Sequence, residues 1–202
     1  VIWFEIISLN SILRLLDLVK NRSDIWIFSD ECYEQLTYDT PFKSIATFNP
    51  EAKNIITFQS CSKTYAMTGW RIGYLAGDEK LVKAISKLQG QSTSCPNSIA
   101  QHAAVEALSG NQNCVNEMRE VFHQRRDLIL KELGYIPGIS CEKPNGAFYV
   151  FPNFKNYLNS KSSNGSIIKT SSDLSLYILD STGVVTVAGD SFGAPYNIGL
   201  SY

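Results

Sequence analysis

Hydrophobic residues in the first half of the chain fall either at helical spacing or in short continuous runs. Residues 12–20 carry apolar side chains three and four positions apart, as in an amphipathic helix. Three compact apolar runs follow, at residues 25–28, 54–58 and 71–77. Unbroken runs of this length are typical of strands buried on both faces of a parallel sheet. The pattern therefore predicts an open α/β sheet.

Beyond the third run the pattern becomes helical and then mixed. Helical spacing covers residues 79–87, 98–108 and 114–133, and the last segment predicts a long helix between two domains. A turn and strand, a loop rich in Ser and Asn, an apolar stretch and a short strand follow, at residues 144–151, 159–172, 173–180 and 184–187.

Two domains follow from this change of pattern. We expect residues 1–111 to form part of a large α/β domain, with a mainly parallel sheet flanked by helices. Residues 112–202 should supply the long bridging helix and a smaller α+β domain.

Composition narrows the possible partners. The chain has 18 Lys and Arg against 19 Asp and Glu, so its net charge of -1 offers no general attraction for nucleic acid. Its five cysteines include no CxxC pair and no histidine at zinc spacing, which argues against a metal site and favours reduced thiols in a cytoplasmic protein. The opening VIWFEIISL lacks the features of a secretory signal, and no apolar run is long enough to cross a membrane.

The most specific segment for chemistry is SCSKTYAMTGWRIGY, residues 60–74. Lys63 lies just past an expected strand end, with Ser60 and Ser62 beside it and Arg71 eight residues later. A lysine amine can attack an aldehyde, whereas a phosphate dianion needs hydroxyl donors and the two-pronged guanidinium of arginine. An isolated lysine or arginine is usually just an exposed side chain, so the hypothesis depends on the whole segment.

A second segment, SDECYE at residues 29–34, places Asp30 at the end of the first expected strand. Ligands of open α/β sheets bind at the carboxyl ends of the strands, where Asp30 and Lys63 would both lie. A buried carboxylate also needs a partner of opposite charge. By itself Asp30 could equally cap a following helix, so its assignment rests on the lysine segment.

Together the two segments resemble the cofactor motifs of the pyridoxal-phosphate-dependent class I and II aminotransferases, the aspartate aminotransferase superfamily of fold type I. The resemblance implies that Lys63 forms a Schiff base with pyridoxal 5'-phosphate. It also implies that Ser60, Ser62 and Arg71 bind the cofactor phosphate, and that Asp30 pairs with the protonated pyridine nitrogen.

The same resemblance implies that Tyr33 hydrogen-bonds the cofactor's ring oxygen, while Glu31 and Glu34 are expected to be solvated or structural. Weaker similarity extends from about residue 11 to the end, which corresponds to the carboxyl-terminal half of a typical member. The segments that carry this weaker similarity are residues 91–108, 144–151 and 184–193.

Two departures from the family pattern affect the expected activity. The closing NIGLSY has Gly199 where the family has an arginine that grips the substrate α-carboxylate. Without that guanidinium an amino acid loses its bidentate anchor and its alignment. The family's NPxNPTG turn and everything upstream of it are also absent from this sequence. We therefore expect a truncated chain whose activity is in doubt.

The leading hypothesis is amino-group transfer between an amino acid and a 2-oxo acid, within amino acid metabolism, by a homodimer in its complete form. A pyridoxal-phosphate lyase or decarboxylase of the same fold stays open, because the lysine segment does not decide which bond at the substrate Cα breaks. A non-catalytic cofactor-binding sensor or a degenerate remnant is the alternative outside the enzymes. No nucleic acid, membrane or metal is expected to take part.

Overall fold

A computed structural model describes residues 7–163 and 165–202. Most of the opening segment considered above as a secretory signal lies outside the described residues. Contacts between residues divide the chain into two compact units, one of residues 6–119 and one whose described part is residues 120–202. Each unit is described by itself below.

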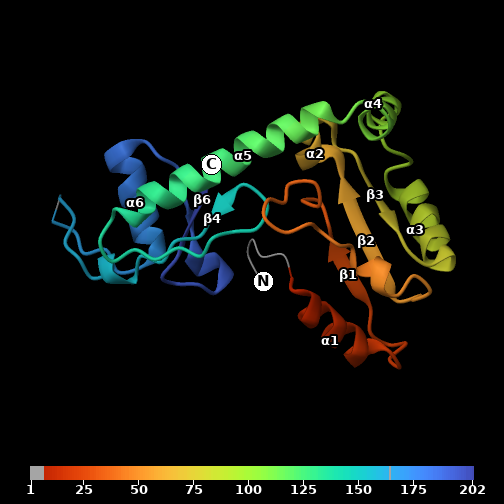
Figure 1. The fold of residues 1–202 in the computed structure, drawn as a ribbon, viewed down its shortest axis with the longest axis horizontal. Coiled ribbons are helices and arrows are strands. Elements are labelled where there is room, and N and C mark those ends of the chain that lie inside the picture. The colour runs from red at the N-terminus through yellow and green to blue at the C-terminus, as the bar shows by residue number, and fades with distance from the viewer. Residues whose placement is uncertain (1–6, 164) are drawn as a thin grey trace. The chain divides into compact units, whose positions relative to one another are not determined.

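The first unit contains a three-stranded sheet in the order β1-β2-β3 (Figure 1). β1 (Ile27–Asp30) pairs parallel with β2 (Ile55–Ser60), but β2 pairs antiparallel with β3 (Gly73–Ala76). Only one of the two pairings is therefore parallel, in contrast to the mainly parallel sheet that was predicted. The connection from β2 to β3 holds only the short helices α2 (Cys61–Thr64) and η2 (Thr68–Trp70), and neither is long enough to run back along the sheet.

The two paired strands at the start of the chain differ in burial. β2 begins with three buried residues, which fits the expected buried strand. β1 alternates between half-buried and exposed positions, and Phe28 is 67% exposed, so the prediction that this strand is buried on both faces is wrong. Among the described residues β1 has a paired neighbour on one side only.

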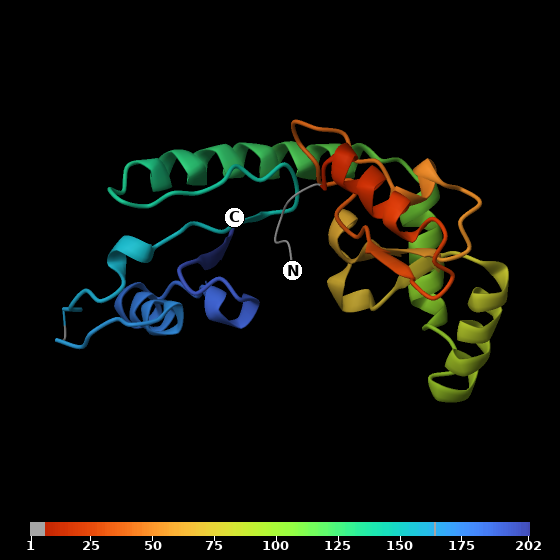
Figure 2. The ribbon, with the colours of Figure 1, turned by 90° about the horizontal axis from the view of Figure 1, so that it is seen from below.

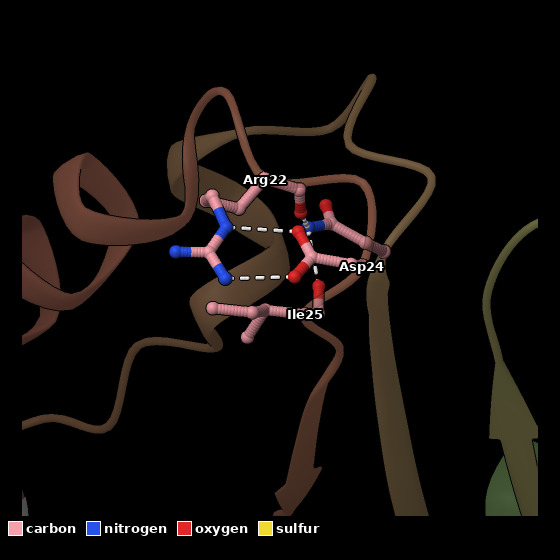
Figure 3. A network of polar contacts seen from close by, with 4 residues as sticks. Arg22, Asp24 and Ile25 are labelled. Atoms are coloured by element: carbon pink, nitrogen blue, oxygen red, sulfur yellow. Dashed lines mark hydrogen bonds and ion pairs between the residues drawn. The ribbon is translucent and has the colours of Figure 1, made fainter.

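The loop before β1 is tied to the start of β2 by the polar contacts in Figure 3. Arg22 donates two hydrogen bonds to the Asp24 carboxylate, 2.8 Å from Nε and 2.7 Å from Nη2. The Asn54 side-chain amide donates to the carbonyl oxygens of Arg22, at 3.3 Å, and Ile25, at 2.8 Å. Because the ion pair is largely exposed, its Coulomb energy contributes little, and the Asn54 amide is the contact that ties the loop to the residue before β2.

Local sequence sets where the helices of the first unit begin. α1 (Leu9–Val19), α3 (Glu79–Ser92) and α4 (Ser98–Ser109) each start after a side chain that accepts a hydrogen bond from a backbone N–H of the first turn. Such caps satisfy donors that have no partner inside the helix. No helix in the described ranges is long and apolar enough to cross a membrane. The capping residues are Ser8, Asp78 and Asn97.

A small apolar cluster packs the segment after β2 against α4. Cys61 is fully buried there and lies with Ile72, Ala100 and Ala104. The small alanines let the helix approach closely, and Tyr65 packs against the edge of the cluster. This packing anchors both ends of the segment that carries Lys63 and Arg71.

The second unit combines helices with a small antiparallel sheet. α5 (Asn113–Gly134) runs through the boundary between the units as one continuous helix (Figure 2). β6 (Ile198–Ser201) pairs antiparallel with β4 (Tyr149–Val150) on one side and β5 (Val187–Ala188) on the other. α6 (Ser171–Thr182) precedes β5 in the chain.

Apolar residues from β6 and α6 form the core of this unit. Ile198 is fully buried and lies with Ile168 and Leu174. A capping box fixes where α6 begins. In it the Thr170 hydroxyl accepts a hydrogen bond from Asp173 N, and the Asp173 carboxylate accepts one from Thr170 N. The placement of β6 therefore depends on a few buried side chains.

Replacing Ile198 tests this core. Ile198→Ala should lower the free energy of unfolding by about 2–5 kcal/mol, because it removes buried methyl groups and leaves a cavity. Ile167→Ala is the matched control, since Ile167 is 56% exposed, and it should change stability by less than about 0.5 kcal/mol. Urea denaturation of the full-length protein measures both, and equal effects would contradict the placement of Ile198.

Candidate functional site

The paired strands β1 and β2 bring Asp30 and Lys63 to the same edge of the sheet. Asp30 lies opposite Phe58 in the parallel register, and Lys63 follows the end of β2 in helix α2. The carboxylate of Asp30 is exposed rather than buried, which differs from the expectation for this residue. Its Oδ1 accepts a hydrogen bond of 3.2 Å from Cys32 N.

The Cys32 thiol lies near both Asp30 and Lys63, and both affect its pKa. The pKa of Cys32 is raised to about 12, mainly by burial and also by a hydrogen bond to Asp30 and by the charge of Asp30. The charge of Lys63 acts on the same thiol and lowers its pKa. The Cys32 thiol therefore lies within electrostatic reach of both Asp30 and Lys63.

Ser60 caps the helix that carries Lys63. Its hydroxyl oxygen accepts a 3.0 Å hydrogen bond from Ser62 N and donates to Ile72 O at 3.4 Å. Ser62 and Lys63 are both half-buried in α2. Ser60 thus links the start of α2 to Ile72, the residue between Arg71 and β3.

The strand β3 comes unusually close to β2 at this point. Gly73 lies opposite Ser60 in the antiparallel register, and a Cβ atom on Gly73 would be 2.8 Å from Gln59 O. Any side chain at this position would push the two strands apart, so the site needs glycine for a close backbone approach.

Arg71 holds a backbone conformation that is uncommon for residues with a side chain. Its φ of 53° is left-handed, as is that of Ala66 at 54°, and such residues each cost about 1–3 kcal/mol. The exposed guanidinium of Arg71 donates from Nη1 to Thr68 O at 2.9 Å. Arg71 also lines a hollow together with Ala66, Gly69, Trp70, Asn97, Ile99 and Ala100.

The remaining residues of the second motif lie in the turn after β1. Tyr33 is half-buried, and its carbonyl accepts from Leu36 N at 2.9 Å. Glu31 is structural rather than solvated, since it is only 3% exposed and accepts hydrogen bonds from Ser44 Oγ and Ile45 N. Sequence reasoning missed these contacts because a donor thirteen residues away leaves no local pattern.

The donor set suits one kind of ligand. A carboxylate favours a cationic ring nitrogen, an amine can bond covalently to an aldehyde, and hydroxyls with a guanidinium favour a phosphate. Strand pairing gathers Asp30, Ser60, Ser62 and Lys63 at one sheet edge. Arg71 lies on the segment between α2 and β3, and the Ser60 hydroxyl joins this segment to the same edge. The residues present therefore fit a phosphorylated pyridine aldehyde.

Comparison with known protein families shows which family this chain belongs to. The family model described as aminotransferase class I and II matches residues 5–202. The chain belongs to this family. Class I and II aminotransferases use pyridoxal phosphate, in agreement with the donor set.

Individual relatives of this aminotransferase chain are similar over nearly its whole length. A probable aspartate/prephenate aminotransferase of Rhizobium leguminosarum bv. phaseoli is 42% identical over 190 residues, which is 93% of this chain and 48% of the relative. An aspartate aminotransferase of Geobacillus stearothermophilus is 43% identical, covering 94% of this chain and 48% of the relative.

The fold agrees with these relatives. The crystal structure of the aspartate aminotransferase from Rhizobium meliloti superposes with a TM-score of 0.91 at 39% identity, over 96% of this chain and 49% of that one. The α/β fold of the aminotransferases is thus shared. The chain spans about half the length of the curated relatives it matches.

The raised pKa of Cys32 predicts slow alkylation. In the cofactor-free full-length protein at pH 8, its thiolate fraction should be about a thousandfold below that of a thiol with the ordinary pKa of 9.0. Iodoacetamide labelling followed by peptide mass spectrometry measures the rate, with the exposed Cys95 as internal control. In urea both thiols should react alike, and equal rates in the folded protein would contradict the site described here.

Proposed function

We propose that the complete protein transfers amino groups between an amino acid and a 2-oxo acid, with pyridoxal 5'-phosphate as cofactor. The observation that carries this proposal is the placement of Asp30 and Lys63 at adjacent strand ends, where both act on the Cys32 thiol. Membership of the aminotransferase family and relatives named for aspartate support it. The end of β1, the turn after it and the segment from the end of β2 to β3 hold the residues that the sequence motifs single out.

Lys63, Asp30 and Tyr33 have separate roles in this proposal. The Lys63 amine attaches the cofactor through its aldehyde and, once released by the incoming substrate, moves the proton of the substrate Cα as general base. Asp30 pairs with the protonated ring nitrogen, and Tyr33 donates to the ring oxygen. When bound, pyridoxal phosphate supplies an electron-withdrawing ring that stabilises negative charge at Cα.

The phosphate is assigned to Ser60, Ser62 and Arg71. Two hydroxyls and a guanidinium provide several donors and one positive charge for a dianion. The left-handed backbone of Arg71 is strain that a binding role would explain, because such outliers cluster at ligand sites.

Homodimer formation and domain roles are part of the same proposal. Trp70 and Ile99 line one hollow in the first unit and are 45% and 69% exposed, so this surface lacks a cover that a second copy would provide.

We assign residues 1–111 to the large cofactor domain and residues 112–202 to the bridging helix and small domain. The five unpaired cysteines favour a cytoplasmic location.

Gly199 favours a second candidate function. It lies buried in β6 opposite Val187, at the position where the family resemblance expects the carboxylate-binding arginine. Cofactor binding without this arginine is what we expect of a lyase or decarboxylase of the same fold, or of a non-catalytic sensor or remnant. Repeated amino-group transfer from aspartate to a 2-oxo acid separates these cases, because a lyase, a decarboxylase or a non-catalytic protein would not sustain it.

Lys63→Ala tests the cofactor assignment. Borohydride treatment of the full-length protein with pyridoxal phosphate should fix the label on the Lys63 peptide, and the variant should lose this label. Its transamination rate should fall on the order of 10⁴-fold, since the attachment and the proton transfer need the same amine. Lys87→Ala, at an exposed position of α3, is the control and should change neither result. Label elsewhere in the wild-type protein would overturn the assignment.

Gly199→Arg tests the missing substrate anchor. Restoring a charge-assisted, two-pronged contact should raise kcat/KM for aspartate about 10- to 100-fold in the full-length protein. Gly199→Met adds a similar length of side chain without charge and should give no gain. Steady-state kinetics compare the three proteins, and equal behaviour of the two variants would show that the position does not contact the substrate carboxylate.

A further inference from the structure

Glu31, next to Asp30, is a buried carboxylate with an unusual set of partners. It is 3% exposed and accepts four hydrogen bonds. Every one of these donors is neutral, so within the described residues its negative charge is balanced by dipoles and not by a cation. The donors are Ser29 Oγ at 3.0 Å, Ser44 Oγ at 3.0 Å, Ile45 N at 3.3 Å and Gln59 Nε2 at 3.5 Å.

Two of the four donors are adjacent in the chain to residues assigned to the cofactor. Ser29 directly precedes Asp30, and Gln59 directly precedes Ser60. Ser44 and Ile45 begin the helix η1 (Ile45–Phe48), which closes the loop that carries Tyr33. One side chain therefore joins the end of β1, the end of β2 and the far end of that loop.

The backbone of Glu31 is fixed as firmly as its side chain. Its N–H donates to Phe58 O at 2.9 Å, which continues the β1–β2 pairing by one residue, and its carbonyl accepts from Glu34 N at 3.0 Å. With little freedom left, Glu31 cannot move without moving Asp30. Its position thus sets the position of its neighbour.

The charge of Glu31 has an effect beyond these contacts. A buried charge is screened less by water than an exposed one, so it acts at longer range. Three charged side chains belong to the same strand ends. Asp30 is next to Glu31 in the chain, Glu34 accepts from the Gln59 amide at 2.9 Å, and Lys63 lies in α2, four residues after Gln59. A negative charge here stabilises positive charge at the sheet edge where the cofactor is proposed to bind.

We propose, resting on the proposed function, that Glu31 is a positioning residue of the cofactor site. Its carboxylate holds Asp30 and the start of the lysine segment in place, and its buried negative charge stabilises the positively charged form of the bound cofactor.

Glu31→Gln in the full-length protein with bound pyridoxal phosphate is the main test. The amide keeps the size and can still accept from the two serine hydroxyls, but it removes the charge and loses the contact with Gln59. The visible absorption of the bound cofactor, titrated with pH, should show a midpoint lower by roughly one pH unit, because loss of the negative charge disfavours the protonated form. Cofactor affinity should fall about tenfold.

Two further variants separate charge from position. Ser44→Ala removes one donor to Glu31 but keeps the charge, so it should weaken cofactor binding a few-fold without lowering the midpoint. Glu51→Gln removes an equal charge from an exposed position and should change neither quantity. If Glu31→Gln does not fold, an unchanged affinity in Ser44→Ala overturns the positioning role.

The outcomes also distinguish this inference from the proposed function. A Glu31→Gln protein that melts earlier but keeps the wild-type midpoint and affinity would show a purely structural role and overturn the inference, while capture of the cofactor on Lys63 stands. A wild-type protein that does not capture the cofactor on Lys63 would overturn both.

Discussion

The candidate site depends on the parallel pairing of β1 with β2. In this register the two strands end side by side, so Asp30 and the helix that carries Lys63 project from one edge. The Asn54 amide fixes where the pairing begins, and the N–H of Glu31 extends it past the last strand residue. A shift of one residue would turn Asp30 to the opposite face of the sheet, because side chains alternate along a strand. The chemistry of the site is therefore set by strand register first.

The return from β2 to β3 places strain where the phosphate is proposed to bind. Ala66 and Arg71 adopt left-handed backbone conformations, and Gly73 passes so close to Gln59 that no side chain would fit. Packing of Cys61 and its cluster against α4 holds both ends of this segment. Strain of this kind persists only where surrounding contacts over-determine the backbone, and a functional role is the common reason for keeping it.

The two units of the chain differ in how much of the family's machinery they carry. The first unit contains every residue of the two cofactor motifs, whereas the second has Gly199 where the resemblance expects an arginine. The residues proposed to bind the cofactor and the position proposed to contact the substrate carboxylate therefore lie in different units. The chain spans about half the length of the relatives it matches.

Sequence alone determined α4 (Ser98–Ser109) to within one residue of the expected 98–108, because periodicity and caps are local properties. α3 (Glu79–Ser92) begins where expected but runs five residues past the expected end at residue 87. The sequence also determined the motif that places Lys63 after a strand, and through it the family. Only the tertiary structure decided the antiparallel direction of β3, the exposed face of β1 and the burial of Glu31. These features depend on contacts between distant residues, as between Glu31 and Ser44, and a local pattern carries no record of which distant segment will meet it.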